Sequence, residues 1–244
     1  MKQTVFKIKS NEKLTDAVYR MRLEGDTSAV AAPGQFVNIR LSGLFLRRPI
    51  SVCDFDDREL TIIYKVVGKG TEEMSCMTAG ETLDVLTGLG NGYCTDPAGD
   101  KPLLIGGGAG VPPMYALAKK LIAEGRRVNV ILGFNTKREV FYEDEFRALG
   151  CDVTVTTADG SYGKQGFVTD ALPEDSSYVY TCGPEPMLKA VYRAVKADGQ
   201  FSFEERMGCG FGACMGCSCK TVTGYKRICK DGPVMRREEI LWED

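Results

Sequence analysis

The chain contains no histidine among its 244 residues. Imidazole is the usual proton acceptor of hydrolytic sites and a common metal ligand. Its absence excludes a Ser-His-Asp triad, a Cys-His nucleophile, a Rieske cluster and zinc fingers that pair cysteine with histidine. Whatever chemistry the protein performs therefore does not depend on imidazole.

The chain also lacks long apolar runs and an excess of charge of one sign. No run reaches the roughly 18 apolar residues of a membrane span, and residues 1–9 alternate apolar and polar side chains, unlike a signal peptide. Lys and Arg total 31 against 33 Asp and Glu, a net charge of -2 that gives no electrostatic case for binding nucleic acid or a membrane surface. We therefore expect a cytoplasmic protein with neither partner.

A length of 244 residues, 43% of them hydrophobic, is enough for two domains with real cores and a small appendage. Residues 1–98 contain short segments with strand patterns, separated by turns rich in Gly and Pro. These patterns predict an antiparallel β-barrel domain. The segments are residues 17–23, 35–41, 60–67 and 81–86.

Residues 99–200 change to an alternation of strands and helices. A strand at 102–105 runs into a glycine loop, a helical pattern follows at 115–122, and 128–132 is a second strand. The alternation continues to a helix ending near 195 and predicts an α/β domain, a parallel sheet with helices on both faces. Residues 201–244 form a third module with no linker before it, so we expect it to dock on the α/β domain.

The glycine loop at residues 106–110 is a candidate nucleotide site, through Gly106, Gly107, Gly108 and Gly110. A loop from a strand into a helix presents free amide groups that suit a pyrophosphate. The loop lacks the third glycine of G-x-G-x-x-G, so a structural tight turn is the alternative.

Cys182, Gly183 and Pro184 end another strand, which we expect at the same sheet edge. A single thiol there is more often a packed small side chain than a reactant, so no nucleophile is expected.

Two barrel segments are weaker candidates. Arg48, Pro49, Ile50 and Ser51 combine a guanidinium suited to phosphate with a hydroxyl and amides that could reach a flavin, although adjacent arginines such as Arg47 and Arg48 are usually a solvated surface pair. Residues 67–71, Val-Gly-Lys-Gly-Thr, open a helix with Thr71 expected as its N-cap. That turn is either a plain helix start or a phosphate site.

The strongest signal is a run of cysteines near the C-terminus. Cys209-x4-Cys214-x2-Cys217 is followed after eleven residues by Cys229, close to the spacing of plant-type 2Fe-2S ferredoxins. Glycines between them permit a tight wrap around the inorganic core. A zinc site usually has two paired-cysteine knuckles, and disulfides need an oxidising compartment, so both alternatives are weaker. We expect Cys219 to be a bystander.

Taken together, these motifs resemble the ferredoxin-NADP reductase superfamily, and residues 202–217 with 229–234 closely resemble the electron-transfer subunits of dihydroorotate dehydrogenase B. The resemblance covers essentially the full length. It implies FAD, a 2Fe-2S cluster, NAD as substrate, and a catalytic partner subunit that carries FMN, in a heterotetramer of two plus two. Residues 87–93, Thr-Gly-Leu-Gly-Asn-Gly-Tyr, lack a proline common in the family, and Ile50 stands where wider reductases often carry an aromatic.

The resemblance also implies roles for individual residues. Cys209, Cys214, Cys217 and Cys229 would hold the cluster, and NADH would bind over residues 106–110 and 182–184. The implied flavin contacts are Arg48, Pro49, Ile50, Ser51, Ile63, Tyr64, Lys65, Gly70 and Thr71.

The expected function is electron transfer from NADH through FAD and the cluster to the partner's FMN, where orotate and dihydroorotate interconvert in pyrimidine biosynthesis. One edge of the cysteine loop should then lie near the flavin and another at the partner surface. Two rival functions are a flavin and iron-sulfur subunit of a hydrogenase or ferredoxin-NADP transhydrogenase, and a zinc-stabilised nucleotide-binding module without redox chemistry. The sequence does not decide whether the nucleotide is NADH or NADPH, because Lys137 and Arg138 could bind the 2′-phosphate of NADPH.

Overall fold

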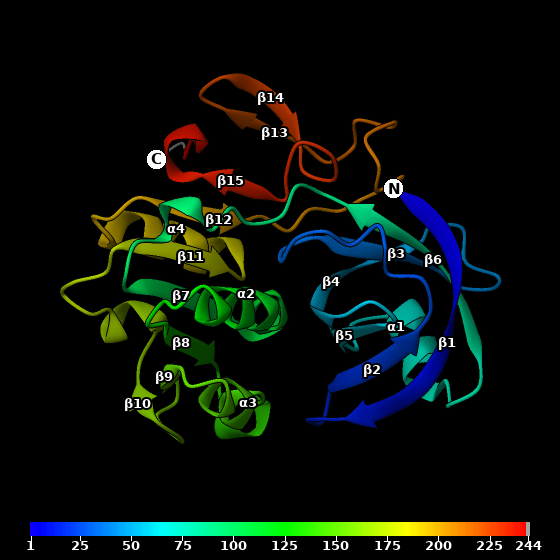
Figure 1. Ribbon diagram of the computed structural model, residues 1–244, viewed down its shortest axis with the longest axis horizontal. Coiled ribbons are helices and arrows are strands. Elements are labelled where there is room, and N and C mark those ends of the chain that lie inside the picture. Colours follow the sequence, from blue (N-terminus) through cyan, green and yellow to red (C-terminus); the bar gives the residue numbers. More distant parts are fainter. Residues whose placement is uncertain (243–244) are drawn as a thin grey trace.

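A closed antiparallel barrel forms the N-terminal region of the computed structural model, which describes residues 1–242 (Figure 1). Its strand order is β1-β2-β5-β4-β3-β6, and the inward-facing positions of the alternating segments, such as Phe6, Met21 and Ile39, fill its core. The predicted barrel is confirmed. Its elements are β1 (Lys2–Lys13), β2 (Val18–Glu24), β3 (Phe36–Arg40), β4 (Arg48–Phe55), β5 (Glu59–Lys65), α1 (Lys69–Cys76) and β6 (Thr82–Leu89).

Two local features of the barrel differ from the sequence prediction. The arginine segment is itself strand β4, in which Pro49 lies opposite Asn38 of β3. The prediction that Thr71 is an N-cap was wrong, because α1 begins at Lys69 with Gly68 as its N-cap. Thr71 lies at the third helical position, and its hydroxyl reaches back to accept the backbone N–H groups of Val67 (2.9 Å) and Gly68 (3.3 Å).

The second region is a seven-stranded sheet with the order β10-β9-β8-β7-β11-β12-β15. All neighbours are parallel except β15, which pairs antiparallel with β12 and was not predicted. The remaining elements of the chain are β7 (Pro102–Gly107), α2 (Val111–Ala123), β8 (Asn129–Phe134), α3 (Glu143–Ala148), β9 (Asp152–Thr157), β10 (Lys164–Gln165), β11 (Tyr178–Cys182), α4 (Glu185–Ala194), β12 (Gly199–Ser202), β13 (Ser218–Thr221), β14 (Gly224–Arg227) and β15 (Val234–Arg236), with short 3-10 turns at Asp96–Ala98, Gly108–Gly110, Lys137–Glu139, Val168–Ala171 and Arg237–Glu239.

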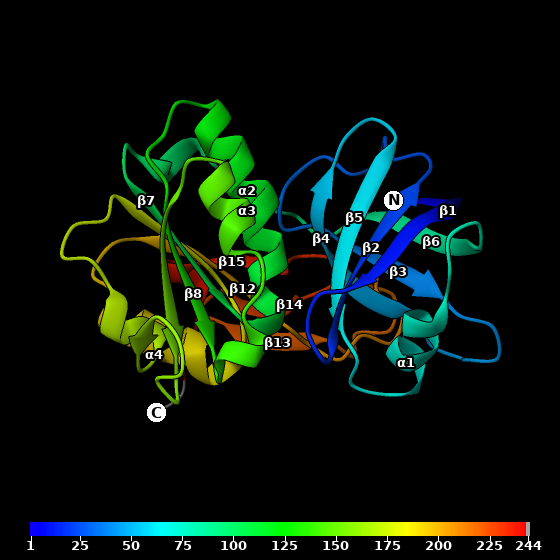
Figure 2. The same ribbon diagram turned by 90° about the horizontal axis from the view of Figure 1, so that it is seen from below.

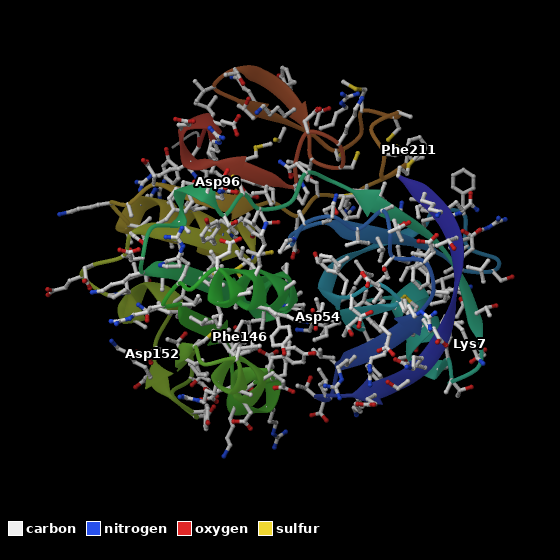
Figure 3. All side chains as sticks on the ribbon, viewed as in Figure 1. Lys7, Asp54, Asp96, Phe146, Asp152 and Phe211 are labelled. Atoms are coloured by element: carbon white, nitrogen blue, oxygen red, sulfur yellow. The ribbon has the colours of Figure 1, made fainter. Side chains whose placement is uncertain are left out.

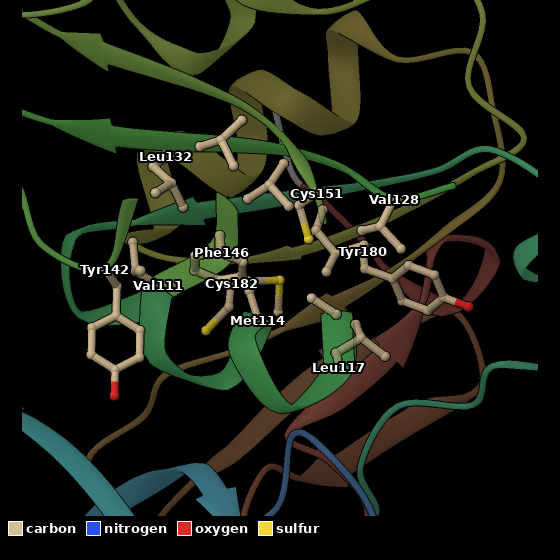
Figure 4. Close-up of a cluster of buried hydrophobic side chains, with 14 of the residues drawn as sticks. Val111, Met114, Leu117, Val128, Leu132, Tyr142, Phe146, Cys151, Tyr180 and Cys182 are labelled. Atoms are coloured by element: carbon tan, nitrogen blue, oxygen red, sulfur yellow. The ribbon is translucent and has the colours of Figure 1, made fainter. Parts of the chain in front are cut away.

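Helices cover both faces of this sheet, as predicted. Helices α2 and α3 lie between the sheet and the barrel, whereas α4 covers the opposite face (Figure 2). Met114 and Leu117 of α2 pack with Leu132 and Tyr180 of the sheet (Figure 4). The same core continues to the barrel residue Cys53, so the two domains share one buried interface.

The C-terminal module lies across both domains (Figure 1). Its buried residues Cys217, Ile228 and Cys229 share a core with Phe36 of the barrel and Leu188 of α4. Docking on the α/β domain was expected, and the contact with the barrel fits the expectation that one edge of the cysteine loop lies near the flavin. In residues 1–242, no helix is long and apolar enough to cross a membrane.

Candidate cofactor sites

The glycine loop and the Cys182 loop meet at the carboxyl edge of the sheet, as expected. Gly106 lies opposite Cys182 in the parallel pairing of β7 with β11. A Cβ added to Gly110 would lie 2.1 Å from the carbonyl oxygen of Cys182, and one on Gly106 would lie 2.9 Å from Cα of Val111. These two glycines therefore allow close packing between the loops and onto α2, whereas Gly107 and Gly108 face the adjacent cleft.

This cleft has a volume of about 850 Å³ and runs from the glycine loop to the barrel. Its shape and position at the ends of parallel strands suit a dinucleotide. Its lining includes Thr15, Asp16, Lys65, Gly107, Gly108, Phe134, Asn135, Arg138, Glu139, Phe167, Pro184 and Met187. Cys182 is buried at the end of β11, and burial, followed by the charge of Glu204, raises the pKa of its thiol, which makes it a poor nucleophile at neutral pH.

A carboxylate in this cleft was not singled out from the sequence. Glu139 accepts hydrogen bonds from the backbone and side-chain nitrogens of Asn135, each at 3.0 Å, and lies 3.6 Å from Nζ of Lys65 across the cleft. Lys137 instead places its ammonium group 5.6 Å from the centre of the Tyr162 ring. Of the predicted basic pair, Arg138 therefore lines the cleft and Lys137 does not. The carboxylate of Glu139, next to Arg138, disfavours binding of a 2′-phosphate.

The two weak barrel motifs come together in space. The guanidinium of Arg48 lies against the first turn of α1, where a Cβ on Gly70 would be 2.1 Å from its Nε. In the part of the chain that the structure describes, Arg48 forms no ion pair and donates only to the carbonyls of Leu46 and Arg47. Arg47, in contrast, is paired with Asp84 at 2.9 Å. Arg48 is therefore available to a phosphate at this helix start, as is the exposed Lys69, the first residue of α1.

Apart from Thr71 in α1, the other residues implied as flavin contacts lie on strands β4 and β5 and differ in orientation. Pro49 and Ser51 are partly exposed on β4, whereas Ile50 packs partly against the barrel core. Tyr64 turns into the barrel, where its hydroxyl donates to Oδ1 of Asn11 at 2.9 Å, and Ile63 packs in the interdomain core. The side chains of Ile63 and Tyr64 are both buried, so these two residues could contact a flavin only through their backbones.

Replacing Arg48 by leucine should weaken FAD binding by about 10- to 100-fold. Hydrogen bonds to charged groups contribute about 1.5–3 kcal/mol, and about 1.4 kcal/mol corresponds to a factor of ten. Flavin content after gel filtration and the Kd from flavin fluorescence measure the effect. Arg58→Leu, in an exposed turn of the same barrel, is the matched control. Equal flavin retention by the two variants would contradict this role for Arg48.

The four predicted cluster cysteines are grouped as two pairs. Sγ of Cys209 accepts the backbone N–H of Cys214 at 3.4 Å and contacts its thiol, and Sγ of Cys217 accepts the N–H of Cys229 at 3.4 Å and contacts its thiol. Two thiolates for each of two irons is the requirement of a 2Fe-2S cluster. A single zinc ion needs all four around one centre. Among residues 1–242, no three histidine, cysteine, aspartate or glutamate side chains are grouped to hold one ion.

The loop stabilises negative charge on the first of these sulfurs. Burial raises the pKa of Cys209, but the N–H groups of Cys214, Phe211 and Ala213 outweigh it and lower that pKa to about 6. Gly210 and Gly212 adopt positive φ of 80° and 91°, which allows the backbone to fold these amides toward the sulfur. The Cys209 sulfur therefore suits an anionic iron-sulfur core, whereas burial, followed by the neighbouring Cys217 thiol, raises the pKa of Cys229 to about 12.

Cys219 lies two residues after Cys217 and packs partly against the same core. It lines a separate groove of about 510 Å³ with Phe203, Tyr225 and Trp242. The bystander role expected of Cys219 from the sequence stays a prediction.

Asn91, in the segment where the chain departs from the family pattern, anchors the module. Its backbone N–H donates to the carbonyl of Gly232 and its side-chain amide to that of Val234, both at 2.7 Å. The contact was not predicted because it joins residues more than 140 positions apart.

The outer edge of the cysteine loop faces solvent. Phe211 is 44% exposed and Met215 55% exposed, next to exposed Cys214. Figure 3 shows Phe211 at the periphery of the molecule. At the start of the loop, the backbone carbonyl of Cys209 accepts a hydrogen bond from Asn38 in β3 of the barrel. The loop thus has one edge on the barrel and one open, the arrangement expected of a carrier between two partners.

Known proteins match the chain over its full length. The iron-sulfur cluster binding domain of dihydroorotate dehydrogenase B matches residues 204–241, and an oxidoreductase NAD-binding domain matches residues 104–193. The dihydroorotate dehydrogenase B (NAD(+)) electron transfer subunit of Geobacillus sp. (strain WCH70) is 43% identical, covering 99% of each chain. That of Bacillus pumilus (strain SAFR-032) is 44% identical over 98% of each.

Solved structures match as well. A chain of an NADH-dependent reduced ferredoxin-NADP oxidoreductase has a TM-score of 0.87 and 32% identity, covering 98% of this chain and 90% of that one. A ferredoxin NADP+ reductase from Neisseria gonorrhoeae with bound FAD and NADP has a TM-score of 0.69 at 19% identity, covering 80% and 90%, which shows a shared fold.

Proposed function

Because the chain belongs to the family of dihydroorotate dehydrogenase B electron transfer subunits, we propose that it passes electrons from NADH through FAD and a 2Fe-2S cluster to a catalytic partner subunit in pyrimidine biosynthesis. The observation that carries this proposal is the paired-cysteine loop, which lies against both the barrel and the α/β domain. The chain is thus an NADH-oxidising oxidoreductase subunit.

We assign the sites by the chemistry of their donors. Cys209, Cys214, Cys217 and Cys229 hold the cluster, Arg48 with the first turn of α1 holds the FAD phosphates, and the cleft beside Gly107 and Gly108 holds NADH. When bound, these groups convert a two-electron donor into single-electron transfers. The corresponding domains are residues 1–98 for FAD, 99–200 for NAD and 201–244 for the cluster.

The protein's own contribution is to position the groups and exclude water. The cleft places a dinucleotide between the α/β domain and the barrel, and the shared interdomain core fixes their separation. No general acid or base is required of the chain, which agrees with the absence of histidine.

The partner we propose is an FMN-bearing dihydroorotate dehydrogenase subunit, in a complex of two plus two. The family name implies a catalytic partner, and the open edge at Cys214 and Met215 offers an exit for electrons. All ten cysteines are free of disulfides, which supports a reducing, cytoplasmic location.

The 32% identity to a ferredoxin-NADP oxidoreductase chain favours a second candidate, a flavin subunit that serves ferredoxin or NADP. Purification with the native partner separates the two functions. A partner with FMN and orotate-reducing activity would support electron transfer to dihydroorotate dehydrogenase. A partner that reduces ferredoxin would refute that function and support the second candidate.

The absorption spectrum before and after NADH tests the proposal directly. The purified subunit should show flavin and 2Fe-2S bands, and both should bleach under anaerobic NADH. A colourless protein containing zinc, or bands that NADH leaves unchanged, would refute electron transfer and favour a nucleotide-binding module.

A further inference from the structure

Asn38 lies on β3 and belongs to none of the motifs found in the sequence. It lies between β4, which we call the flavin strand because it carries Arg48, and the loop from Cys209 to Cys217, which we call the cluster loop. Its side chain is only 1% exposed. Across the sheet its partner is Pro49 of β4, and directly opposed residues of antiparallel strands project from the same face. Asn38 is therefore the immediate neighbour of the β4 segment that we assign to FAD.

The amide of Asn38 contacts the backbone of a proposed cluster ligand. Its Nδ2 donates to the carbonyl oxygen of Cys209 at 3.2 Å. The next residue, Gly210, has φ of 80°, and a Cβ on it would lie 2.3 Å from this Nδ2. The loop thus approaches the amide as closely as glycine permits, which ties the ligand to the barrel strand.

The same amide carries an unsatisfied group. Oδ1 of Asn38 is buried and has no hydrogen-bond partner in the structure described for residues 1–242. Buried polar atoms are nearly always paired, and leaving one unpaired destabilises the fold. An apolar side chain would avoid that cost, so the contact with Cys209 is best explained by function.

The hydrogen bond from Asn38 also places a donor near the negative charge that the cluster would carry. Sγ of Cys209 accepts N–H groups from Ala213 at 3.2 Å and Cys214 at 3.4 Å, and Asn38 adds a donor to the carbonyl of the same residue. Dipoles directed at a cluster ligand stabilise the added negative charge of the reduced cluster and raise its reduction potential. Loss of the Asn38 donor should make the cluster harder to reduce.

We propose that Asn38 is a positioning residue that holds the Cys209 edge of the cluster against the flavin strand and raises the cluster's reduction potential. This inference rests on the function proposed above. In the step concerned, one electron leaves the reduced flavin and the oxidised cluster gains it, with NADH as the source of electrons.

The test compares Asn38→Asp and Asn38→Leu in the purified subunit. Aspartate keeps the shape but removes the donor and adds negative charge, and leucine removes both polar atoms at similar volume. Anaerobic stopped-flow mixing with NADH should show unchanged flavin bleaching and cluster reduction slowed about 10-fold or more. Redox titration followed by EPR should show a more negative cluster potential, with the larger shift in the aspartate variant.

Thr27→Val is the matched control, because it also deletes a buried barrel hydrogen bond, from Oγ1 of Thr27 to the carbonyl of Asp56 at 2.5 Å, away from the cluster loop. It should leave the cluster potential unchanged. The inference is overturned if both Asn38 variants keep the wild-type potential and rate, or if they lose FAD, since Asn38 would then only support the barrel. A wild-type protein without flavin and cluster bands would instead refute the proposed function.

Discussion

Cys229→Ser should abolish the 2Fe-2S bands while FAD stays bound and NADH still bleaches it. Cys229 is buried in the core that the module shares with both domains, and its N–H contacts the sulfur of Cys217. Serine is a poor ligand for iron and leaves one iron with a single thiolate. The contact of Arg48 with Gly70, which we assign to FAD, involves no residue of the module. Hydride transfer should therefore be retained, and electron transfer to the partner should fall at least 100-fold.

The measurements are iron and flavin content, the EPR signal after dithionite, and anaerobic bleaching by NADH. Cys219→Ser is the matched control, since Cys219 lies on β13 in a separate groove and should keep the cluster. Loss of the cluster from Cys219→Ser but not from Cys229→Ser would show that the ligand set is wrong. Loss of FAD from Cys229→Ser would show that the module cannot be separated from the barrel.

The features that the sequence predicted correctly are those with a local signal. Period-two alternation at residues 17–23 and 35–41 identified barrel strands, and an apolar run bounded by glycine identified β7. The cysteine spacing is equally local, because the chain must wrap one small inorganic core. In each case the signal lies within a few residues of the structure that it specifies.

The features that were missed depend on contacts between distant segments. Strand β15 has three residues and gains its structure by pairing with β12, so no periodicity reveals it. Arg47 and Arg48 are adjacent residues of the same type, so their spacing does not separate their roles. The structure separates them, because Arg47 pairs with Asp84 and Arg48 lies against Gly70. The contact of Asn38 with Cys209 spans 171 residues. Sequence patterns therefore located the candidate sites, and tertiary packing assigned roles within them.

At Thr71, in contrast, a local sequence signal gave a wrong prediction, because it placed the N-cap of α1 three residues after its actual position at Gly68. A threonine before a helix usually caps it, but Gly68 takes that position because extended backbone there lets the helix start at Lys69. The hydroxyl of Thr71 still satisfies free N–H groups, from inside the helix rather than before it.

Gly110→Ala should weaken NADH binding at least 10-fold and leave the flavin and cluster spectra intact. Gly110 has φ of -83°, which alanine adopts readily, so the effect is one of space alone. The new methyl group would lie 2.1 Å from the carbonyl oxygen of Cys182 and 2.6 Å from the nitrogen of Gly183. Both atoms are backbone of a buried strand end, so the two loops that flank the nucleotide cleft must separate.

Overpacking of this kind costs about 1–3 kcal/mol, which should appear as a lower free energy of unfolding as well as weaker binding. The rate of flavin bleaching against NADH concentration gives the apparent Kd, and calorimetry with NAD+ checks it without turnover. Gly125→Ala is the matched control, because Gly125 has φ of 81° and open space around it, so it bears a conformational cost without a clash. If Gly110→Ala binds NADH as the wild type does, the contact between the two loops does not shape the nucleotide site, and the cleft must bind its ligand mainly through the segment from Asn135 to Glu139 and the barrel side.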